Sequence, residues 1–132
     1  MAYYDDLSEY VYAPTETPMV NVGWLAAGHF FPRAKASRLF VADLLFLADR
    51  QQNIMRGVHD CEFCDQESPL RMTAPVERGW VSLGMGEIHV AGREGRVYAA
   101  PSLIVHYVDA HGYEPPADFV EAVELAAEAY RS

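Results

Sequence analysis

The sequence predicts an α+β domain, in which a small antiparallel β-sheet carries about three packed helices. Two short β-forming runs flank the Gly-rich segment 91–95, which is typical of a β-hairpin. Apolar residues recur at helical spacing within residues 117–130, which indicates an amphipathic helix. The chain has 132 residues, of which 51% are hydrophobic, so it is long enough for one domain with its own core.

This single domain is expected to span residues 20–132, after an extended N-terminal segment at 1–19. Pro14 and Pro18 favour an extended chain there, because proline has a fixed φ and no backbone N–H. Residues 20–25 alternate apolar with small or polar side chains, which predicts a strand that ends near Gly28.

A helix is predicted from Arg38 to about Gln52, with Ser37 as its N-cap. Its apolar stripe faces the core and consists of Phe40, Leu44, Leu47 and Ala48, widened by Val41 and Leu45. Further strands are predicted at 70–75, 80–83, 86–90 and 96–99, the last two forming the hairpin.

Two more helices are expected in the C-terminal third. The first spans 102–111, with Pro101 in its first turn and Gly112 just after its end. Pro115 and Pro116 then force a corner before the last helix at 117–130. The buried side of that helix is predicted to consist of Phe119, Val123, Ala126, Ala127 and Tyr130.

The sequence His59-Asp60-Cys61-Glu62-Phe63-Cys64 contains both cysteines of the chain. Two sulfurs two residues apart can bind one ion from a single tight turn, and a C-x₂-C pair is half of a tetrahedral zinc site. His106 and His111 lie near the end of a predicted helix and could supply the other half. The sequence therefore predicts a fold stabilised by Zn²⁺.

Five candidate ligands compete for four positions: Cys61, Cys64, His106, His111 and His59. His106 and His111 stand about 140° apart around an ideal helix, since five residues turn by roughly 100° each. They can share an ion if His111 lies where the helix ends, and Gly112 marks that end. His59 is the competing fourth ligand, and the choice between it and His111 stays open. His29 and His89 lack such neighbours, and His89 alternates with apolar residues as a sheet-surface residue would.

The two cysteines could instead be redox-active thiols or ligands of a catalytic zinc. A reactive thiolate needs a helix N-terminus or nearby cations, whereas Asp60, Glu62 and Asp65 surround these sulfurs. A catalytic zinc would keep one open position and use a carboxylate base such as Glu62 or Glu87. The nucleobase deaminase motifs are absent, so a closed structural site is favoured and an enzyme is the less favoured class. In a third reading the domain binds no metal and the cysteines and histidines pack in its core.

Charge and hydropathy restrict the partners. The net charge is −9 and the pI about 4.8, so the surface repels nucleic acid but suits a basic protein partner. No apolar run reaches the roughly 18 residues that span a membrane, and no secretory signal is recognisable at the start. A cytoplasmic protein with reduced cysteines is therefore expected.

Several stretches resemble a family of small uncharacterised bacterial proteins, mostly from actinobacteria and similar lineages. They are the segment 56–64 (RGVHDCEFC), the segment 98–119 (YAAPSLIVHYVDAHGYEPPADF) and the opening 21–25 (NVGWL). The resemblance implies one domain and carries no assigned activity. It does place the five candidate ligands in motif-like stretches, as expected if they act together.

These observations predict a small cytosolic protein-interaction module whose fold is stabilised by a structural zinc. A zinc-dependent hydrolase with an open metal position is the alternative. An immunity or antitoxin-like binder of a basic protein is a lesser alternative, based on size and charge. The oligomeric state is left undetermined.

Overall fold

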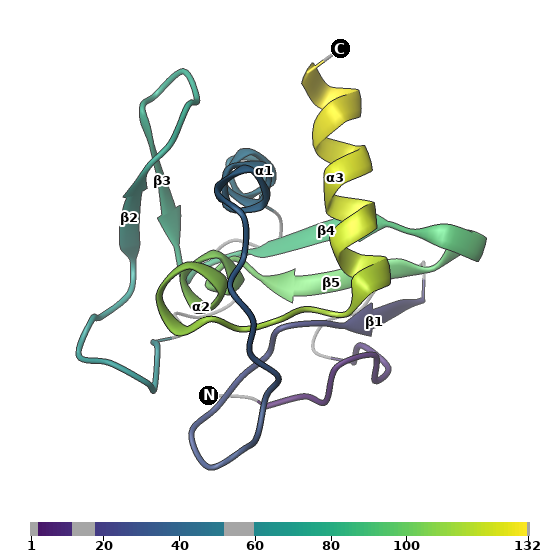
Figure 1. Cartoon of the computed structure of the whole chain (residues 1–132), viewed down its shortest axis with the longest axis horizontal. Helices are drawn as coiled ribbons and strands as arrows, with labels where there is room; N and C mark the ends of the chain where they lie inside the picture. The colour runs from purple at the N-terminus through teal and green to yellow at the C-terminus, as the bar shows by residue number, and fades with distance from the viewer. Residues whose placement is uncertain (1–2, 12–17, 52–59, 132) are drawn as a thin grey trace.

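The computed structural model describes residues 3–11, 18–51 and 60–131 (Figure 1). The elements follow the order β1 Met19–Asn21, α1 Arg38–Ala48, β2 Leu70–Thr73, β3 Trp80–Leu83, β4 Glu87–Ala91, the short 3₁₀ turn Arg93–Gly95, β5 Val97–Pro101, α2 Ile104–His111 and α3 Ala117–Arg131. The α+β class with small sheets and three helices is therefore confirmed for the described part of the chain.

The strands form two separate sheets. The larger one has the order β1-β5-β4, in which β4 and β5 form the antiparallel hairpin predicted around the Gly-rich turn. β1 runs parallel to β5 at its other edge, with Val20 opposite Tyr98. β2 and β3 form an antiparallel hairpin of their own, which extends away from the larger sheet (Figure 1).

The two faces of the larger sheet pack against two different clusters of buried residues. Side chains alternate along each strand, so Ile88 and Val90 of β4 and Tyr98 of β5 face the main core under the helices. The opposite face carries Ala99 of β5, which packs with Tyr10, Met19 and Trp24 in a smaller cluster. The helices and the N-terminal segment thus cover opposite faces of the sheet.

Helix α1 begins where its cap predicts. The Ser37 hydroxyl accepts a hydrogen bond from the Phe40 amide at 3.0 Å, which satisfies one of the free donors of the first turn. All four predicted core residues, from Phe40 to Ala48, are buried, which confirms the predicted stripe. The helix ends at Ala48, four residues before the expected end at Gln52.

The strand expected at 20–25 is shorter than predicted. β1 ends at Asn21, and the chain turns at Gly23, whose φ is +79°. A Cβ at Gly23 would lie 2.7 Å from Cδ1 of Ile104 in α2, so glycine is needed both for the turn and for the close approach. This turn carries the chain from the sheet to the loop that faces the Cys-containing turn.

Two other predictions were wrong: the place of Pro101 in a helix and the burial of Tyr130. Pro101 is the last residue of β5, where it lies opposite Glu87, and α2 starts three residues later at Ile104. Tyr130 is 56% exposed, although Phe119, Val123 and Ala127 are buried as expected. Tyr130 instead stacks with the guanidinium of Arg50, 4.8 Å from its ring centroid, near the surface. A cation–π contact of this kind needs no burial.

The N-terminal residues are hydrogen-bonded to β1 and to the chain after α2. The amide of Leu7 donates to Asn21 O at 2.6 Å, and the amide of Asn21 donates to Ser8 O at 2.8 Å. The buried Tyr113 hydroxyl donates to Asp6 Oδ2 at 2.6 Å. The division into a segment at 1–19 and a domain at 20–132 stays a prediction. In the described ranges, no helix has the length and apolar character required to cross a membrane.

Candidate metal centre

Both cysteines lie in the irregular turn that leads to the β2–β3 hairpin. Cys61 is buried and Cys64 is exposed. The amide of Phe63 donates to Cys61 Sγ at 3.4 Å, and the amide of Ser68 donates to Asp60 Oδ1 at 2.8 Å. These bonds close the turn on itself. An N–H pointing at a sulfur also favours the thiolate form that binds metals.

The two histidines belong to α2. His106 is buried in the helix, and His111 is its last residue. Gly112 follows with φ +68° in the left-handed region, where its amide donates to Tyr107 O, so the helix stops as its glycine predicts. Because the helix ends there, the two rings approach despite a spacing of five residues, and their planes meet at 83° with centroids 4.9 Å apart.

The four ligand atoms converge on one point. Cys61 Sγ lies 3.3 Å from His111 Nε2, and Cys64 Sγ lies 3.4 Å from His106 Nε2. The two Nε2 atoms are 3.3 Å apart, and all four atoms lie within 4.8 Å of one another. Tetrahedral zinc, with bonds of about 2.3 Å to sulfur and 2.0 Å to nitrogen, separates its ligand atoms by roughly 3.3–3.8 Å. The cluster could therefore hold a metal ion with little movement.

Burial sets the protonation of these groups. Desolvation lowers the pKa of His106, and the neighbouring His111 lowers it further, against a smaller opposite effect of Asp109. Desolvation also lowers the pKa of His111, helped by Arg33. The pKa of the Cys61 thiol is raised, mainly by burial. At neutral pH both imidazoles are thus uncharged and have lone pairs to offer, whereas a metal would have to displace the thiol proton.

Phe63, between the two cysteines, anchors the turn to the helix. Its ring lies 5.6 Å from the His111 ring and 5.9 Å from the Tyr107 ring, and it meets Phe31 edge-on at 5.3 Å. These aromatic contacts hold the sulfurs over α2 without a metal. Sequence reasoning gave Phe63 no role, although a large apolar residue inside a C-x₂-C turn has few other places to pack.

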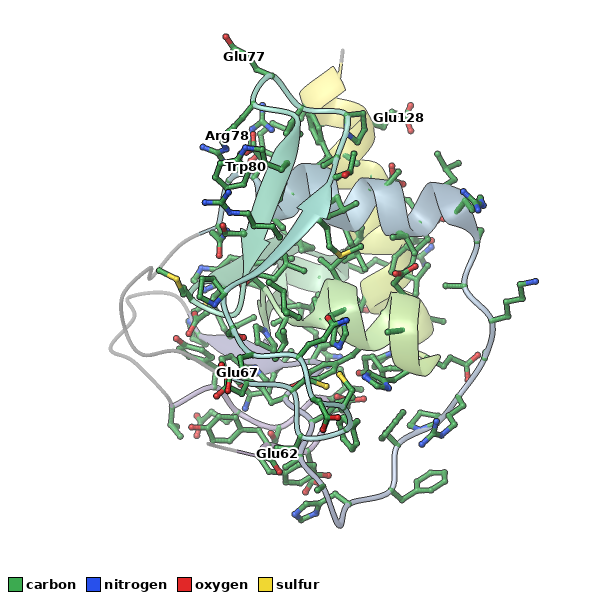
Figure 2. The ribbon with its side chains drawn as sticks, turned by 90° about the vertical axis from the view of Figure 1, so that its left-hand side faces the viewer. Glu62, Glu67, Glu77, Arg78, Trp80 and Glu128 are labelled. Carbon is green, nitrogen blue, oxygen red and sulfur yellow. The ribbon has the colours of Figure 1, made fainter. Side chains whose placement is uncertain are left out.

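The two carboxylates considered as catalytic bases are engaged elsewhere. Glu62 lies at the outer surface of the turn (Figure 2), and its Oε1 accepts a hydrogen bond from the Ala27 amide at 2.9 Å. Glu87 is buried and accepts hydrogen bonds from the Tyr10 hydroxyl at 2.8 and 3.0 Å. Neither belongs to the group of ligand atoms that converge.

The other histidines fall outside this group or outside the described residues. His59, the fifth candidate ligand, lies outside the described residues. His29 is exposed and stacks on Tyr3 with ring centroids 3.7 Å apart. His89 lies on the sheet face that packs against the N-terminal segment, and its side chain is 14% exposed. Its Nε2 donates to Glu87 Oε1 at 2.8 Å, beneath the N-terminal segment.

Fold and site together define a small α+β domain with a Cys₂His₂ group, contributed by a C-x₂-C turn and the end of one helix. The chain belongs to the family described as domain of unknown function DUF7919, which matches residues 2–124. The match includes all four residues of the group. No curated protein and no solved structure matches the chain.

Proposed function

We propose that Cys61, Cys64, His106 and His111 bind one structural Zn²⁺ in a small protein-interaction module. The observation that carries this proposal is the convergence of the four ligand atoms within 4.8 Å. Two thiolates and two neutral imidazoles form a donor set that zinc prefers, and four protein ligands complete its tetrahedron. A filled tetrahedron leaves no position for a reactive water, which favours a structural role.

Zinc in this position would connect parts of the chain that are distant in sequence. The pair Cys64 and His106 is separated by 42 residues, and the pair Cys61 and His111 by 50. The residues between them include both hairpins. Because the unfolded chain does not hold the four ligands together, the free energy of metal binding adds to folding stability.

The engaged carboxylates support the structural role over the hydrolase. A general base must come within hydrogen-bond reach of the metal-bound water. Glu62 is held by the Ala27 amide and Glu87 by Tyr10 and His89, so reaching the metal would break existing hydrogen bonds. The hydrolase would need a carboxylate that the cluster does not contain.

The metal content of the purified protein tests the proposal. Inductively coupled plasma mass spectrometry after dialysis should find about one zinc per chain, as expected for a closed site. Cys61→Ser should lose it, and His29→Ala should retain it as the matched histidine control. Wild-type protein that carries no zinc, and whose melting temperature is unchanged by a chelator, would contradict the proposal.

The interaction role is supported by the charge around the turn. Asp60, Glu62, Asp65 and Glu67 are all exposed within eight residues, on a protein of net charge −9. We propose that the zinc holds this acidic turn in shape for a basic protein surface. No hydrogen bond in the described part of the chain occupies the carboxylates of Asp65 or Glu67.

Covalent crosslinking in cells tests this second part. A partner crosslinked to wild type should be a basic protein, and Asp65→Asn with Glu67→Gln should abolish its recovery. Glu94→Gln with Glu124→Gln removes two exposed charges elsewhere and should leave recovery unchanged. Equal recovery with both double variants would reject the acidic turn as the binding surface, whatever the zinc content.

A further inference from the structure

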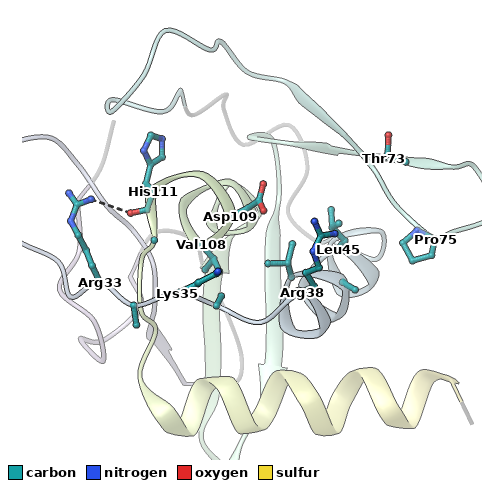
Figure 3. A pocket seen from close by; sticks show the side chains of 14 residues that line it. Arg33, Lys35, Arg38, Leu45, Thr73, Pro75, Val108, Asp109 and His111 are labelled. Atoms are coloured by element: carbon teal, nitrogen blue, oxygen red, sulfur yellow. Dashed lines mark hydrogen bonds between the residues drawn. The ribbon is translucent and has the colours of Figure 1, made fainter.

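A concave cleft lies between the segment 33–38, α1, the end of α2 and the β2–β3 hairpin (Figure 3). Its volume is about 850 Å³, within the range of small-molecule sites. His111 is the one member of the Cys/His group that lines it. The cleft therefore lies beside the candidate metal centre but is a distinct cavity.

The cleft concentrates positive charge on an acidic protein. Arg33, Lys35 and Arg38 all line it, which is three of the ten basic residues and includes the single lysine. Asp109 is the one carboxylate in the lining, and it forms no ion pair with any of them in the described ranges. The local balance is thus opposite in sign to that of the whole chain, with a net charge of −9.

Two of these cations have no partner in the described residues. Lys35 and Arg38 form neither a hydrogen bond nor an ion pair nor a ring contact there. By contrast, Arg93 binds Glu121 through two hydrogen bonds of 2.6 and 2.8 Å, and Arg78 pairs with Asp49 at 2.9 Å. Arg33 is also occupied, since it donates to His111 O at 3.2 Å. Lys35 and Arg38 are therefore available to an anion in the cleft.

The rest of the lining is mostly apolar. Val41 and Leu45 of α1 and Val108 of α2 contribute to it, with Leu45 and Val108 largely buried. Apolar walls with a few charged groups at one side are typical of sites for amphipathic ligands, because the walls take up an apolar body and the charges fix its orientation.

The segment that bears the cations is held against the end of α2. The amide of Ala34 donates to Gly112 O at 2.9 Å, and Arg33 forms a β-bridge with Tyr113. The amide of Glu114 donates to Pro32 O at 2.9 Å. These backbone bonds fix the rim of the cleft in advance, which lowers the ordering cost of binding.

We propose that this cleft binds a small organic anion with an apolar body, and that Lys35 and Arg38 neutralise its carboxylate or phosphate. The ligand's apolar part lies against the α1 and α2 side chains. The proposal does not depend on the identity or presence of a metal at the neighbouring cluster.

Titration with octanoate, followed by NMR amide shifts and calorimetry on the full chain as purified, tests the proposal. Octanoate should shift the amides of Ala34, Ala36, Val108 and Gly112, and octyltrimethylammonium should not. Octyl phosphate in a parallel titration distinguishes the two headgroups, and saturable binding of either supports the site.

Charge variants test whether octanoate binds in the cleft. Lys35→Glu and Arg38→Glu should each weaken octanoate binding by roughly tenfold or more, as expected for a lost charge-assisted contact. The exposed Arg96 forms no side-chain hydrogen bond, ion pair or ring contact among the described residues, so Arg96→Glu is the matched control and should change affinity less than about twofold. Lys35→Gln and Arg38→Gln repeat the test if a reversed charge disturbs folding.

Three results would overturn the proposal. The first is no saturable binding of either anion, and the second is equal weakening by Arg96→Glu. The third is a wild-type dimer that Lys35→Glu converts to a monomer in sedimentation velocity, without octanoate binding, which would assign the cleft to a second copy of the chain.

Discussion

Two polar clusters in this protein differ in how their hydrogen-bonding groups are satisfied. On the sheet face under the N-terminal segment, the buried Glu87 receives hydrogen bonds from Tyr10 and from His89. Both carboxylate oxygens of Glu87 thus meet a donor within the protein. At the end of α2, two sulfurs and two imidazole nitrogens face one another at 3.3 to 3.4 Å.

The second arrangement is made of groups whose lone pairs can bind a metal once the thiol protons are displaced. Each Nε2 carries at most one hydrogen, yet His111 Nε2 lies 3.3 Å from both Cys61 Sγ and His106 Nε2. Once the thiols are deprotonated, the convergent lone pairs repel one another unless a cation lies between them. The comparison therefore distinguishes a cluster whose hydrogen bonds stabilise the apoprotein from one that could gain stability by binding a metal ion.

The largest expected effect is the loss of Cys61, a ligand of the proposed zinc. Cys61→Ser should lower the free energy of unfolding by more than about 3 kcal/mol, because the ion that ties the turn to α2 is lost. Urea denaturation of zinc-loaded wild type and variant measures this. A chelator should destabilise wild type by a similar amount and leave Cys61→Ser unchanged, and a chelator effect on the variant would count against Cys61 as a ligand.

An intermediate effect is expected in the sheet-face cluster. Glu87→Ala leaves the Tyr10 hydroxyl and the His89 imidazole without their acceptor, so the free energy of unfolding should fall by about 2–3 kcal/mol. Zinc content should stay at the wild-type value, which elemental analysis checks. If zinc is lost together with stability, the two clusters are not independent.

A smaller effect is expected when only one donor of the same cluster is removed. Tyr10→Phe keeps the ring in the pocket with Met19, Trp24 and Ala99 but deletes the hydroxyl that contacts Glu87. About 1–2 kcal/mol should be lost in thermal or urea unfolding. Tyr3→Phe, at a more exposed tyrosine, serves as the control and should cost less than about 0.5 kcal/mol.

Protons should compete with zinc at the Cys/His cluster, which makes zinc affinity dependent on pH. Zinc affinity should decrease as the pH falls, because both thiols and both imidazoles must be deprotonated to bind. Zinc titrations with a competing chelator between about pH 8 and pH 6 measure it, and proton release on binding appears in calorimetry in buffers of different ionisation enthalpy. A pH-independent affinity would mean that the thiols are not ligands.

Local signals predicted much of this structure. The Ser37 cap, the Gly-rich hairpin and Gly112 each specify backbone geometry within a few residues, and the structure has each of them in place. The sequence allowed His106 and His111 to converge if His111 lay at the helix end that Gly112 marks, and the structure has this arrangement, whereas the choice between His111 and His59 had stayed open. The C-x₂-C spacing indicated the partner turn, since two sulfurs at that distance can meet one ion.

The features that were missed depend on contacts between distant residues. The parallel pairing of β1 with β5 and the hydrogen bond of Tyr113 to Asp6 leave no periodic signal in the sequence. Strand alternation placed His89 on a sheet surface, but it does not show that the N-terminal segment covers that face. Phe63 was missed because its role depends on where α2 lies relative to the turn.

Zinc K-edge X-ray absorption of the purified protein tests the metal centre most directly. The first coordination shell should contain two sulfurs at about 2.3 Å and two imidazole nitrogens at about 2.0 Å, and His106→Ala should remove one nitrogen. A shell with fewer than two sulfurs, or with a water oxygen in place of a nitrogen in the wild type, would contradict a closed Cys₂His₂ site.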